Sequence, residues 1–186
     1  MRTLIAIMIA GPLLASAADS LYDRAERKLQ AIENRRVKRG SAVSFTPQEI
    51  DAWARVAVPA IVPKGIRDEH VELFDGSASG SAVVDLLKMR QAKGAQPNWF
   101  MSRLLAGERP LKVWVRVESG GGRCTVYLTR VELSGVVMKE TVLDFLVRTF
   151  FMPLYPDAKI NQPFDLDYDI DRIDITPRAV IATMKR

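Results

Sequence analysis

Three aspartates at alternate positions, Asp165, Asp167 and Asp169, have the spacing in this chain that most resembles a reactive site. Oxygen ligands at positions one, three and five begin a calcium-binding loop, which also requires glycine at position six and glutamate at position twelve. Counted from Asp165, those two positions hold Ile170 and Thr176. Because the residues between the aspartates are apolar, the pattern favours the solvated face of a strand over a cation site.

His70 is the only histidine in the chain, so a Ser-His-Asp mechanism would depend on it as the base. A single histidine also excludes histidine-rich metal clusters. Residues 76–80, Gly-Ser-Ala-Ser-Gly, resemble a nucleophile elbow, but the central position must be serine and is Ala78. We therefore predict a protein that is not an enzyme and needs no metal or cofactor, with a hydrolase using His70 as an open alternative.

The single cysteine, Cys124, excludes an intramolecular disulfide. It lies in a segment where apolar and polar residues alternate, which predicts a buried, inert thiol. The glycine run at residues 120–122 opens no helix, so it predicts a hairpin turn and not a phosphate-binding loop. Since no set of reactive residues identifies a reaction, the elements of the chain have to indicate the function.

The first residues have the order of a secretory signal: a basic Arg2, an apolar run at residues 4–14 and the small residues Ala15-Ser16-Ala17. The run is shorter than the roughly twenty apolar residues of a membrane-spanning helix. We predict that residues 1–17 are a signal peptide and that the exported, mature chain starts near Ala18. The cysteine needed for a lipoprotein anchor is absent from the cleavage region.

The composition suits one globular domain with a real core, since 48% of the residues are hydrophobic and 26% are charged. The formal net charge of +5 permits attraction to anionic surfaces. An exported protein meets lipid headgroups more often than nucleic acid. We therefore expect an anionic membrane surface, and no nucleic acid, among its partners.

Residues 20–39 predict an amphipathic helix, with apolar residues at helical spacing and Gly40 after them. Its polar side is basic, and a basic amphipathic helix can lie on anionic lipid. A solvated face on a helix that docks through its leucines is the alternative. The predicted membrane-contact residues are Arg24, Arg27, Lys28, Arg35, Arg36, Lys38 and Arg39. We assign residues 18–42 to this segment and residues 43–186 to a single domain.

A second helix is predicted after a brief extended segment at residues 43–45. Thr46-Pro47-Gln48-Glu49 combines a threonine cap, a proline at the first helical position and a glutamate three residues after the cap. This combination is a capping box, which is a strong signal for the start of a helix. Pro59 and Pro63 are expected to end the helix.

From residue 66 the apolar residues alternate with polar ones, which predicts strands. Residues 70–74 and 81–87 flank a turn-rich stretch at residues 75–80 and suggest a hairpin. Residues 111–117 and 124–128 form the clearest pair, turned by the glycine run. Both arms of this second hairpin are long for a globular sheet.

Residues 140–151 are apolar around much of the helical circumference, which predicts a buried third helix. Alternation resumes over residues 164–170, with apolar residues on one side and aspartates on the other. The phase then slips by one residue before Ile173, which predicts a β-bulge. Residues 180–184 predict a last strand.

Together these elements predict an α+β fold in which a strongly curved antiparallel sheet wraps around an apolar helix to form a half-barrel, with an additional N-terminal amphipathic helix. The apolar strand faces outnumber the helices available to cover them. If the central helix fills the trough only partly, an apolar cavity of about 300–1,000 Å³ remains for a ligand. A closed core with no cavity is the alternative, and the sequence leaves both open.

The order of parts resembles the half-barrel lipid-binding proteins of bacterial envelopes that are related to the tubular lipid-binding (TULIP-like) superfamily. The resemblance covers residues 43–186. It rests on the capped helix at residues 45–50, the hairpin at 111–133, the helix after Met138 and the segment at 163–180. It implies an exported, periplasmic, non-enzymatic protein that binds or carries lipid acyl chains.

The resemblance also implies an apolar ligand trough. Its predicted lining residues are Val113, Val115, Val117, Cys124, Val126, Leu128, Leu143, Leu146, Phe164, Leu166 and Ile170, with Trp53 and Trp99 at the mouth. Each of these residues also has a simple interpretation as part of the core. The alternative function is an envelope interaction protein with a filled core and no ligand, which docks to a partner protein through the basic helix or an open sheet edge.

Overall fold

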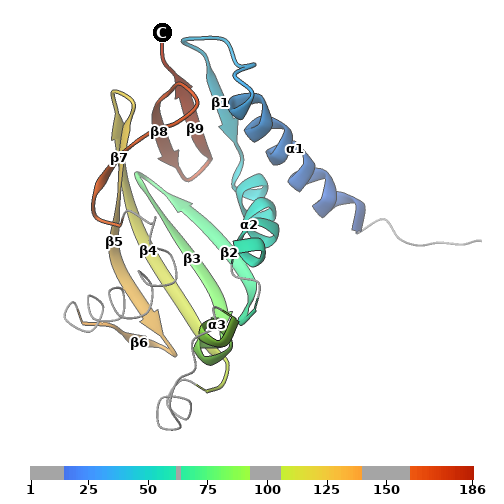
Figure 1. Ribbon diagram of the computed structural model, residues 1–186, viewed down its shortest axis with the longest axis vertical. Helices are drawn as coiled ribbons and strands as arrows, with labels where there is room; N and C mark the ends of the chain where they lie inside the picture. The colour runs from blue at the N-terminus through green and yellow to red at the C-terminus, as the bar shows by residue number, and fades with distance from the viewer. Residues whose placement is uncertain (1–14, 62–63, 93–105, 140–159) are drawn as a thin grey trace, which may run out of the picture.

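The computed structural model describes residues 15–61, 64–92, 106–139 and 160–186 (Figure 1). They form an α+β fold with antiparallel strand pairs, as the sequence predicted. The helices are α1 (Ala15–Glu33), α2 (Pro47–Ile61) and α3 (Leu86–Ala92). The strands are β1 (Ala42–Phe45), β2 (Ile66–Phe74), β3 (Ser77–Val84), β4 (Arg109–Gly120), β5 (Arg123–Leu133), β6 (Val136–Val137), β7 (Pro163–Asp165), β8 (Ile170–Thr176) and β9 (Ala179–Met184).

The described strands form two sheets, whereas the sequence predicted one. Sheet A has the order β1-β9-β8, and sheet B has the order β2-β3-β4-β5-β6, with β7 also paired to β5. The chain leaves sheet B after β7 at a turn in which Tyr168 and Asp169 have φ angles of 56° and 61°. These left-handed residues interrupt the strand predicted over residues 164–170. Asp167 and Asp169 therefore lie in a turn between the sheets and not on a strand face.

The bulge predicted near the end of the chain is confirmed. The pairing of β8 with β9 shifts between Ile170, which lies opposite Met184, and Arg172, which lies opposite Thr183. Two steps along β8 therefore match one step along β9, as in a β-bulge. The predicted last strand is confirmed as β9.

The predicted long hairpin is confirmed as β4 and β5, and its apolar residues share one face of sheet B. Val113 lies opposite Val131, and Val115 lies opposite Leu128. Two positions separate the residues on β4 but three separate their partners on β5, so β5 contains a bulge that the sequence analysis did not predict. The bulge keeps Val131 on the apolar face, from which strict alternation after Leu128 would turn it away.

The hairpin of β2 and β3 has a tighter turn than the sequence predicted. Only Asp75 and Gly76 form the turn, and pairing begins directly with Phe74 opposite Ser77. Gly76 has a φ of 61°, in the left-handed region that glycine adopts without steric cost. The serines and glycine that follow Gly76 therefore belong to β3 and not to a loop.

The strand predicted over residues 81–87 ends at Val84, and a helix follows it. Asp85 caps α3, because its Oδ1 accepts a hydrogen bond from the Lys88 backbone N–H at 3.0 Å. The Asp85 N–H donates in turn to the Gly65 carbonyl at 2.7 Å. Gly65 has a φ of 89°, and a Cβ at this position would lie 2.6 Å from the Asp85 carbonyl oxygen. Glycine is therefore the only residue that fits at position 65 without strain.

The first helix ends at Glu33, before the predicted end at residue 39. Arg35 has a φ of 53°, and the N–H of Arg36 returns to the Ala31 carbonyl at 2.8 Å. This is a left-handed helix end, which arginine can adopt at some cost in strain. Residues 34–41 form the loop from α1 to β1.

The second helix begins where the capping box predicted. The Thr46 N–H donates to Glu49 Oε2 at 2.8 Å, and the Glu49 N–H donates to Thr46 Oγ1 at 3.2 Å. Pro59 does not end the helix as expected, since α2 continues to Ile61. Pro59 lies in the last turn, so only the carbonyl of Arg55 loses its helical partner there.

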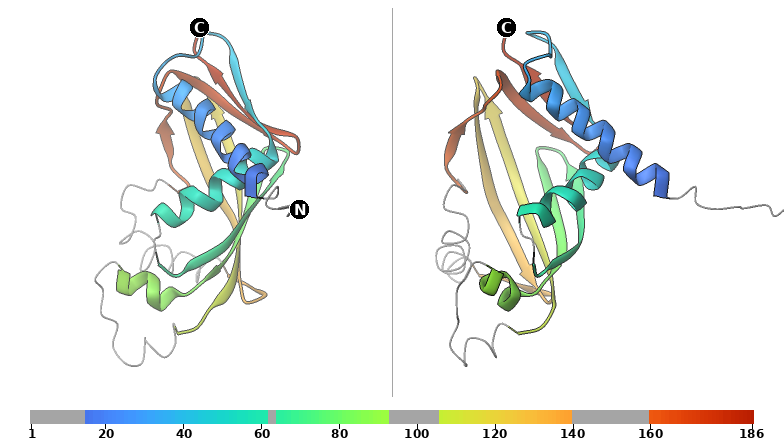
Figure 2. Two further views of the ribbon diagram at one scale, coloured as in Figure 1. Left: turned by 90° about the vertical axis from the view of Figure 1, so that its right-hand side faces the viewer. Right: turned by 45° about the vertical axis from the view of Figure 1, so that its right-hand side comes forward.

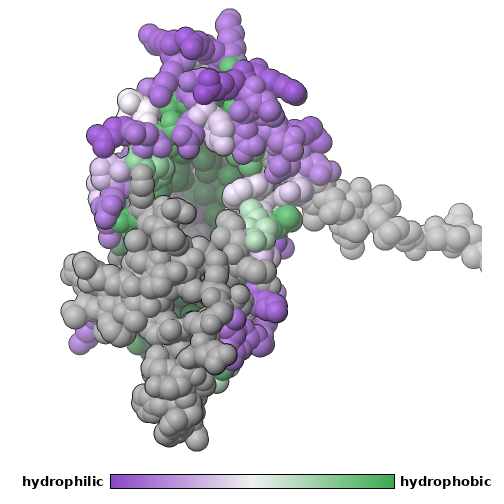
Figure 3. Space-filling view, viewed as in Figure 1, coloured by the Kyte–Doolittle hydropathy of each residue, from purple (hydrophilic) through white to green (hydrophobic). Residues whose placement is uncertain are grey.

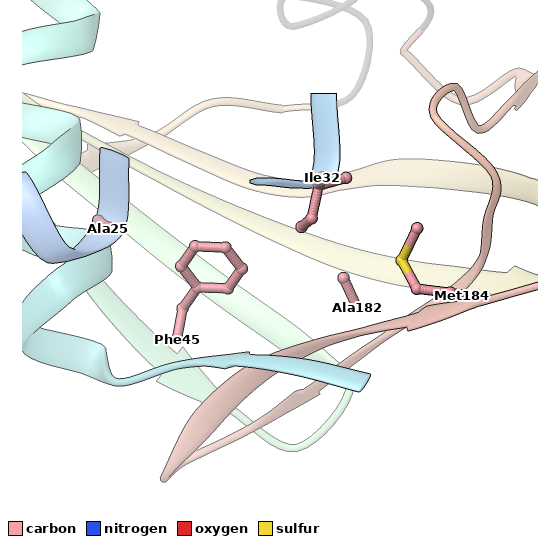
Figure 4. Packing of buried hydrophobic residues seen from close by; sticks show 5 residues of the cluster. All are labelled: Ala25, Ile32, Phe45, Ala182 and Met184. Carbon is pink, nitrogen blue, oxygen red and sulfur yellow. The ribbon is translucent and has the colours of Figure 1, made fainter. Parts of the chain in front are cut away.

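A hydrophobic core cluster joins the two ends of the chain. α1 contributes Ala25 and Ile32, β1 contributes Phe45, and β9 contributes Ala182 and Met184 (Figure 4). All five residues are buried. Since β1 pairs with β9, sheet A provides the floor against which α1 packs.

The strand β8 connects sheet A to the turns of both sheet B hairpins. Ser119 Oγ donates to the Ile173 carbonyl and accepts from the Ile173 N–H, both at 2.7 Å. The Gly76 N–H donates to the Ile175 carbonyl at 2.9 Å. These bonds satisfy the outer edge of β8, which would otherwise be an open sheet edge.

The predicted third helix at residues 140–151 lies outside the described residues, as do Trp99, Leu143 and Leu146. Within the described ranges, no helix is both long enough and apolar enough to span a membrane.

Candidate functional site

An apolar pocket of about 290 Å³ lies between α1, α2 and sheet A. Its lining residues are Ala25, Leu29, Ile32, Glu33, Phe45, Ile50, Trp53, Tyr168, Ile170, Ile173, Val180 and Ala182. Only Glu33, Tyr168 and the indole N–H of Trp53 bring polar side-chain atoms to this set. In the view of Figure 3, apolar side chains form the floor of a hollow below the hydrophilic upper end of the molecule.

The periodicity of each element explains why these residues meet. Ala25, Leu29 and Ile32 follow one another at spacings of four and three, so they form a single stripe on α1. Val180 and Ala182 alternate along β9 and point to the same side of sheet A. Because both alanines are small, the helix and the sheet leave space between them that larger side chains would fill.

Lys28 fixes α1 to the start of α2. Its Nζ lies 2.7 Å from Oε2 of the buried Glu49 and donates to the Ser44 carbonyl at 2.8 Å. Burial alone would raise the pKa of Glu49, but hydrogen bonds from Lys28 and from the Thr46 backbone, with the charges of Lys28 and Arg24, lower it. The ion pair therefore holds the α1 wall of the pocket against β1 and α2.

The structure describes ten of the thirteen predicted ligand-binding residues and gives them different surroundings. Trp53 and Ile170 line the pocket. Those on one face of sheet B are Val113, Val115, Val117, Cys124, Val126, Leu128 and, through β7, Phe164. Leu166 is buried after β7, where its N–H donates to the Gly122 carbonyl at 2.7 Å. The other three, Trp99, Leu143 and Leu146, lie outside the described residues.

Most of the pocket was missed by the sequence analysis. The stripe on α1 was recognised only as the apolar side of a helix, and Phe45, Val180 and Ala182 were recognised only as strand residues. The floor of the pocket exists because β1 pairs with β9. No local signal in the sequence says that these two short strands are neighbours.

The predicted membrane-contact residues have different surroundings. Lys28 is turned inward to Glu49. Arg35 Nε lies 3.7 Å from Asp169 Oδ2. The other five, Arg24, Arg27, Arg36, Lys38 and Arg39, are exposed.

A second, polar groove of about 470 Å³ lies along the edge of β2 and contains His70. Arg55 Nη2 lies 2.9 Å from His70 Nδ1 and 2.8 Å from Asp51 Oδ2. His70 Nδ1 also lies 3.3 Å from Asp51 Oδ1. The ring of His70 therefore contacts Arg55 and Asp51, and among the described residues no side-chain hydrogen bond joins it to Ser81, its cross-strand neighbour. The groove is therefore not arranged as a base and nucleophile.

The carboxylates and the thiol of the described residues have ordinary surroundings. Within the part of the chain that the structure describes, no group of three or more histidine, cysteine, aspartate or glutamate side chains could hold a metal ion. Asp165 Oδ1 lies 3.7 Å from Arg123 Nε. Cys124 is buried, as predicted, and burial raises the pKa of its thiol.

Comparison with known proteins gives no relative, since no family model, curated protein or solved structure matches this chain. The function must therefore be argued from the pocket and from the surface around it.

Proposed function

We propose that this chain is an exported, non-enzymatic protein that binds a lipid acyl chain in the pocket between α1, α2 and sheet A. The observation that carries the proposal is the lining of the pocket, which is apolar except near Glu33, Tyr168 and Trp53. A site with so few polar groups can recognise a ligand only through its apolar surface.

An acyl chain suits this lining because it needs no hydrogen-bond partner. Each buried methylene contributes about 0.8 kcal/mol. The volume of about 290 Å³ lies at the lower end of the range for small-molecule sites, which is about 300–1,000 Å³. The pocket therefore suits one chain rather than two, with Glu33 and the exposed Tyr168 at its polar end.

We also propose the half-barrel architecture that the sequence resemblance implies, with the apolar face of sheet B as a second part of the lipid site. The support is the strand register, which puts Val113, Val115 and Val117 on one face with their partners on β5. The periplasm is the proposed location, because the signal-like N-terminus and the resemblance both favour it.

The test fills the pocket by one substitution. Ala182 lines the pocket on β9, and Ala179 lies on the opposite face of the same strand. Ala182→Leu should lower the affinity for a fluorescent fatty acid at least tenfold, because the added methyls occupy the space of the ligand. Ala179→Leu, the matched control, should bind as the wild type does. Fluorescence titration measures both affinities.

The proposal is wrong if the wild type neither binds the fluorescent fatty acid nor carries lipid when native mass spectrometry examines protein purified from cells. It is also wrong if Ala182→Leu binds with unchanged affinity. Val180→Phe fills the same pocket from a neighbouring position and serves as a second variant if Ala182→Leu does not fold.

A further inference from the structure

Ten basic side chains of the described residues have an acidic partner. On sheet B and around it these are Arg67, Lys112, Arg116, Arg123 and Arg130, and elsewhere Lys28, Arg35, Arg55, Lys88 and Arg172. Such pairs leave little net charge on the surface that they cover. Basic side chains without an acidic partner therefore identify the parts of the surface that carry net positive charge.

Five exposed bases without an acidic partner among the described residues gather at one end of the molecule. Three of them, Arg36, Lys38 and Arg39, belong to the loop between α1 and β1, and the other two are Lys185 and Arg186. We call these five residues the terminal basic patch. Lys185 and Arg186 were not among the predicted membrane-contact residues, because they are distant from the loop along the chain.

Backbone contacts bring the two segments of the terminal basic patch together. The Gly40 N–H donates to the Lys185 carbonyl at 3.0 Å, and the Met184 N–H donates to the Ser41 carbonyl at 2.9 Å. A Cβ on Gly40 would lie 3.7 Å from Arg186 Cγ. Figures 1 and 2 show the C-terminus beside the loop between α1 and β1 from three directions.

Acidic residues border the patch on one side. The Lys185 N–H donates to the Asp169 carbonyl at 2.8 Å, so the turn with Asp167 and Asp169 lies beside the C-terminus. The carboxylate of Asp169 faces Arg35. Asp171 follows on β8. The patch is therefore a basic surface with one acidic margin, and the five bases outnumber the carboxylates along it.

We propose that the terminal basic patch docks this protein on an anionic lipid bilayer. Basic residues near an anionic membrane surface each add to the binding free energy without needing a specific geometry. The apolar pocket lies at the same end, since Ile32 and Glu33 precede the basic loop directly. Tyr168 is 43% exposed on the neighbouring turn, and tyrosine favours the interface between membrane and water.

A bilayer fits these features better than a nucleic acid does. A single-stranded nucleic acid is held by several aromatic side chains on which successive bases stack, whereas Tyr168 is the one exposed aromatic residue that we find beside the patch among the described residues. A bilayer would instead bring acyl chains close to an apolar pocket. Docking by charge does not depend on occupation of the pocket, so the surface and the pocket can be tested separately.

The experiment measures flotation with vesicles of phosphatidylcholine and phosphatidylglycerol in a ratio of about 7:3, against vesicles of phosphatidylcholine alone. The protein is purified from the exported fraction of the cells, so that its N-terminus is the one that cellular processing leaves. The variant is Arg36→Ser/Lys38→Ser/Arg39→Ser. The matched control is Lys64→Ser/Lys139→Ser/Arg178→Ser, which removes the same charge from three exposed bases that also lack an acidic partner among the described residues.

We expect the patch variant to bind anionic vesicles at least tenfold more weakly, and the control to stay within about threefold of the wild type. About 0.5 M salt should release the wild type, because screening shortens the reach of exposed charges. Equal losses in both variants would show that only net charge matters and would overturn the proposal. Binding to RNA with none to anionic vesicles would also overturn it.

Ala182→Leu separates this inference from the proposed function. A filled pocket should leave vesicle binding unchanged while it lowers the affinity for the fatty acid at least tenfold. If the wild type binds vesicles but no fatty acid, the surface proposal stands and the pocket proposal fails. If it binds fatty acid but no anionic vesicle, the surface proposal fails alone.

Discussion

Glu49 and Glu72 each pair with a lysine but differ in burial. Glu49 is 3% exposed and closes a capping box while it contacts Lys28. The side chain of Glu72 is 61% exposed where it contacts Lys112. A charged hydrogen bond stabilises a fold more when water cannot replace it. The two pairs therefore allow a direct comparison of buried and exposed ion pairs in one protein.

Glu49→Gln should lower the free energy of unfolding by about 1–3 kcal/mol at neutral pH, because Lys28 loses the charge of its partner. Glu72→Gln, the control, should cost less than about 1 kcal/mol, as exposed pairs do. Urea denaturation of the three proteins measures both differences. Equal effects of the two substitutions would contradict the assigned role of Lys28 and Glu49.

The effect of Glu49→Gln should also depend on pH. The folded pKa of Glu49 lies below its ordinary value of 4.5. The stabilisation by this carboxylate is therefore complete above pH 4.5 and is lost as the pH falls through the folded pKa. Unfolding free energies of the wild type and of Glu49→Gln should converge in acid. A constant difference across that range would contradict the ionised pair.

At the scale of elements, local signals predicted local structure. The capping box at Thr46 and the glycine-turned hairpin of β4 and β5 were found because a few neighbouring residues determine them. The end of α1 and the continuation of α2 past Pro59 were not predicted, because arginine at positive φ and proline in a last turn oppose ordinary preferences. Tertiary contacts decide such positions.

The bulge in β5 was not predicted, although the sequence contains a signal for it. The apolar residues of β5 change from even positions, ending at Leu128, to odd positions, beginning at Val131. That change of phase could have predicted the bulge in β5, in the same way as the change of phase before Ile173 predicted the bulge in β8. The division into two sheets has no such signal, because it depends on the left-handed conformation of Tyr168 and Asp169.

Gly65 provides a test of the joint between α2 and sheet B. Gly65→Ala should lower the free energy of unfolding by about 1–2 kcal/mol from left-handed backbone strain and by about 1–3 kcal/mol more from the contact with the Asp85 carbonyl. Gly135→Ala, where φ is 77° and no atom lies within 4 Å of the new Cβ, should show only the strain. Thermal denaturation compares them, and equal losses would contradict the steric argument.

At the scale of the whole molecule, the two sheets depend on few polar contacts. Ser119 joins β4 to β8 by two hydrogen bonds to one residue, Ile173. Ser119→Ala leaves the partly buried carbonyl and N–H of Ile173 without this partner, which should cost about 1–3 kcal/mol. Thr129→Ala, which removes an exposed bond to the Trp114 carbonyl, is the control.

Hydrogen exchange shows where the loss occurs. Ser119→Ala should increase exchange in residues 170–184 of sheet A and leave the centre of β4 and β5 protected, since sheet B keeps its own ladder. Uniform loss of protection in both sheets would show that they unfold as one unit, which contradicts a separable seam. The control should exchange as the wild type does.

The pairing of β1 with β9 has a consequence for biogenesis. Ala42 lies opposite Thr183, so β1 has no strand partner until β9 has been synthesised. Contacts between residues so distant in sequence form slowly. A nascent chain therefore has no floor for its apolar pocket until β9 has emerged from the ribosome and paired with β1.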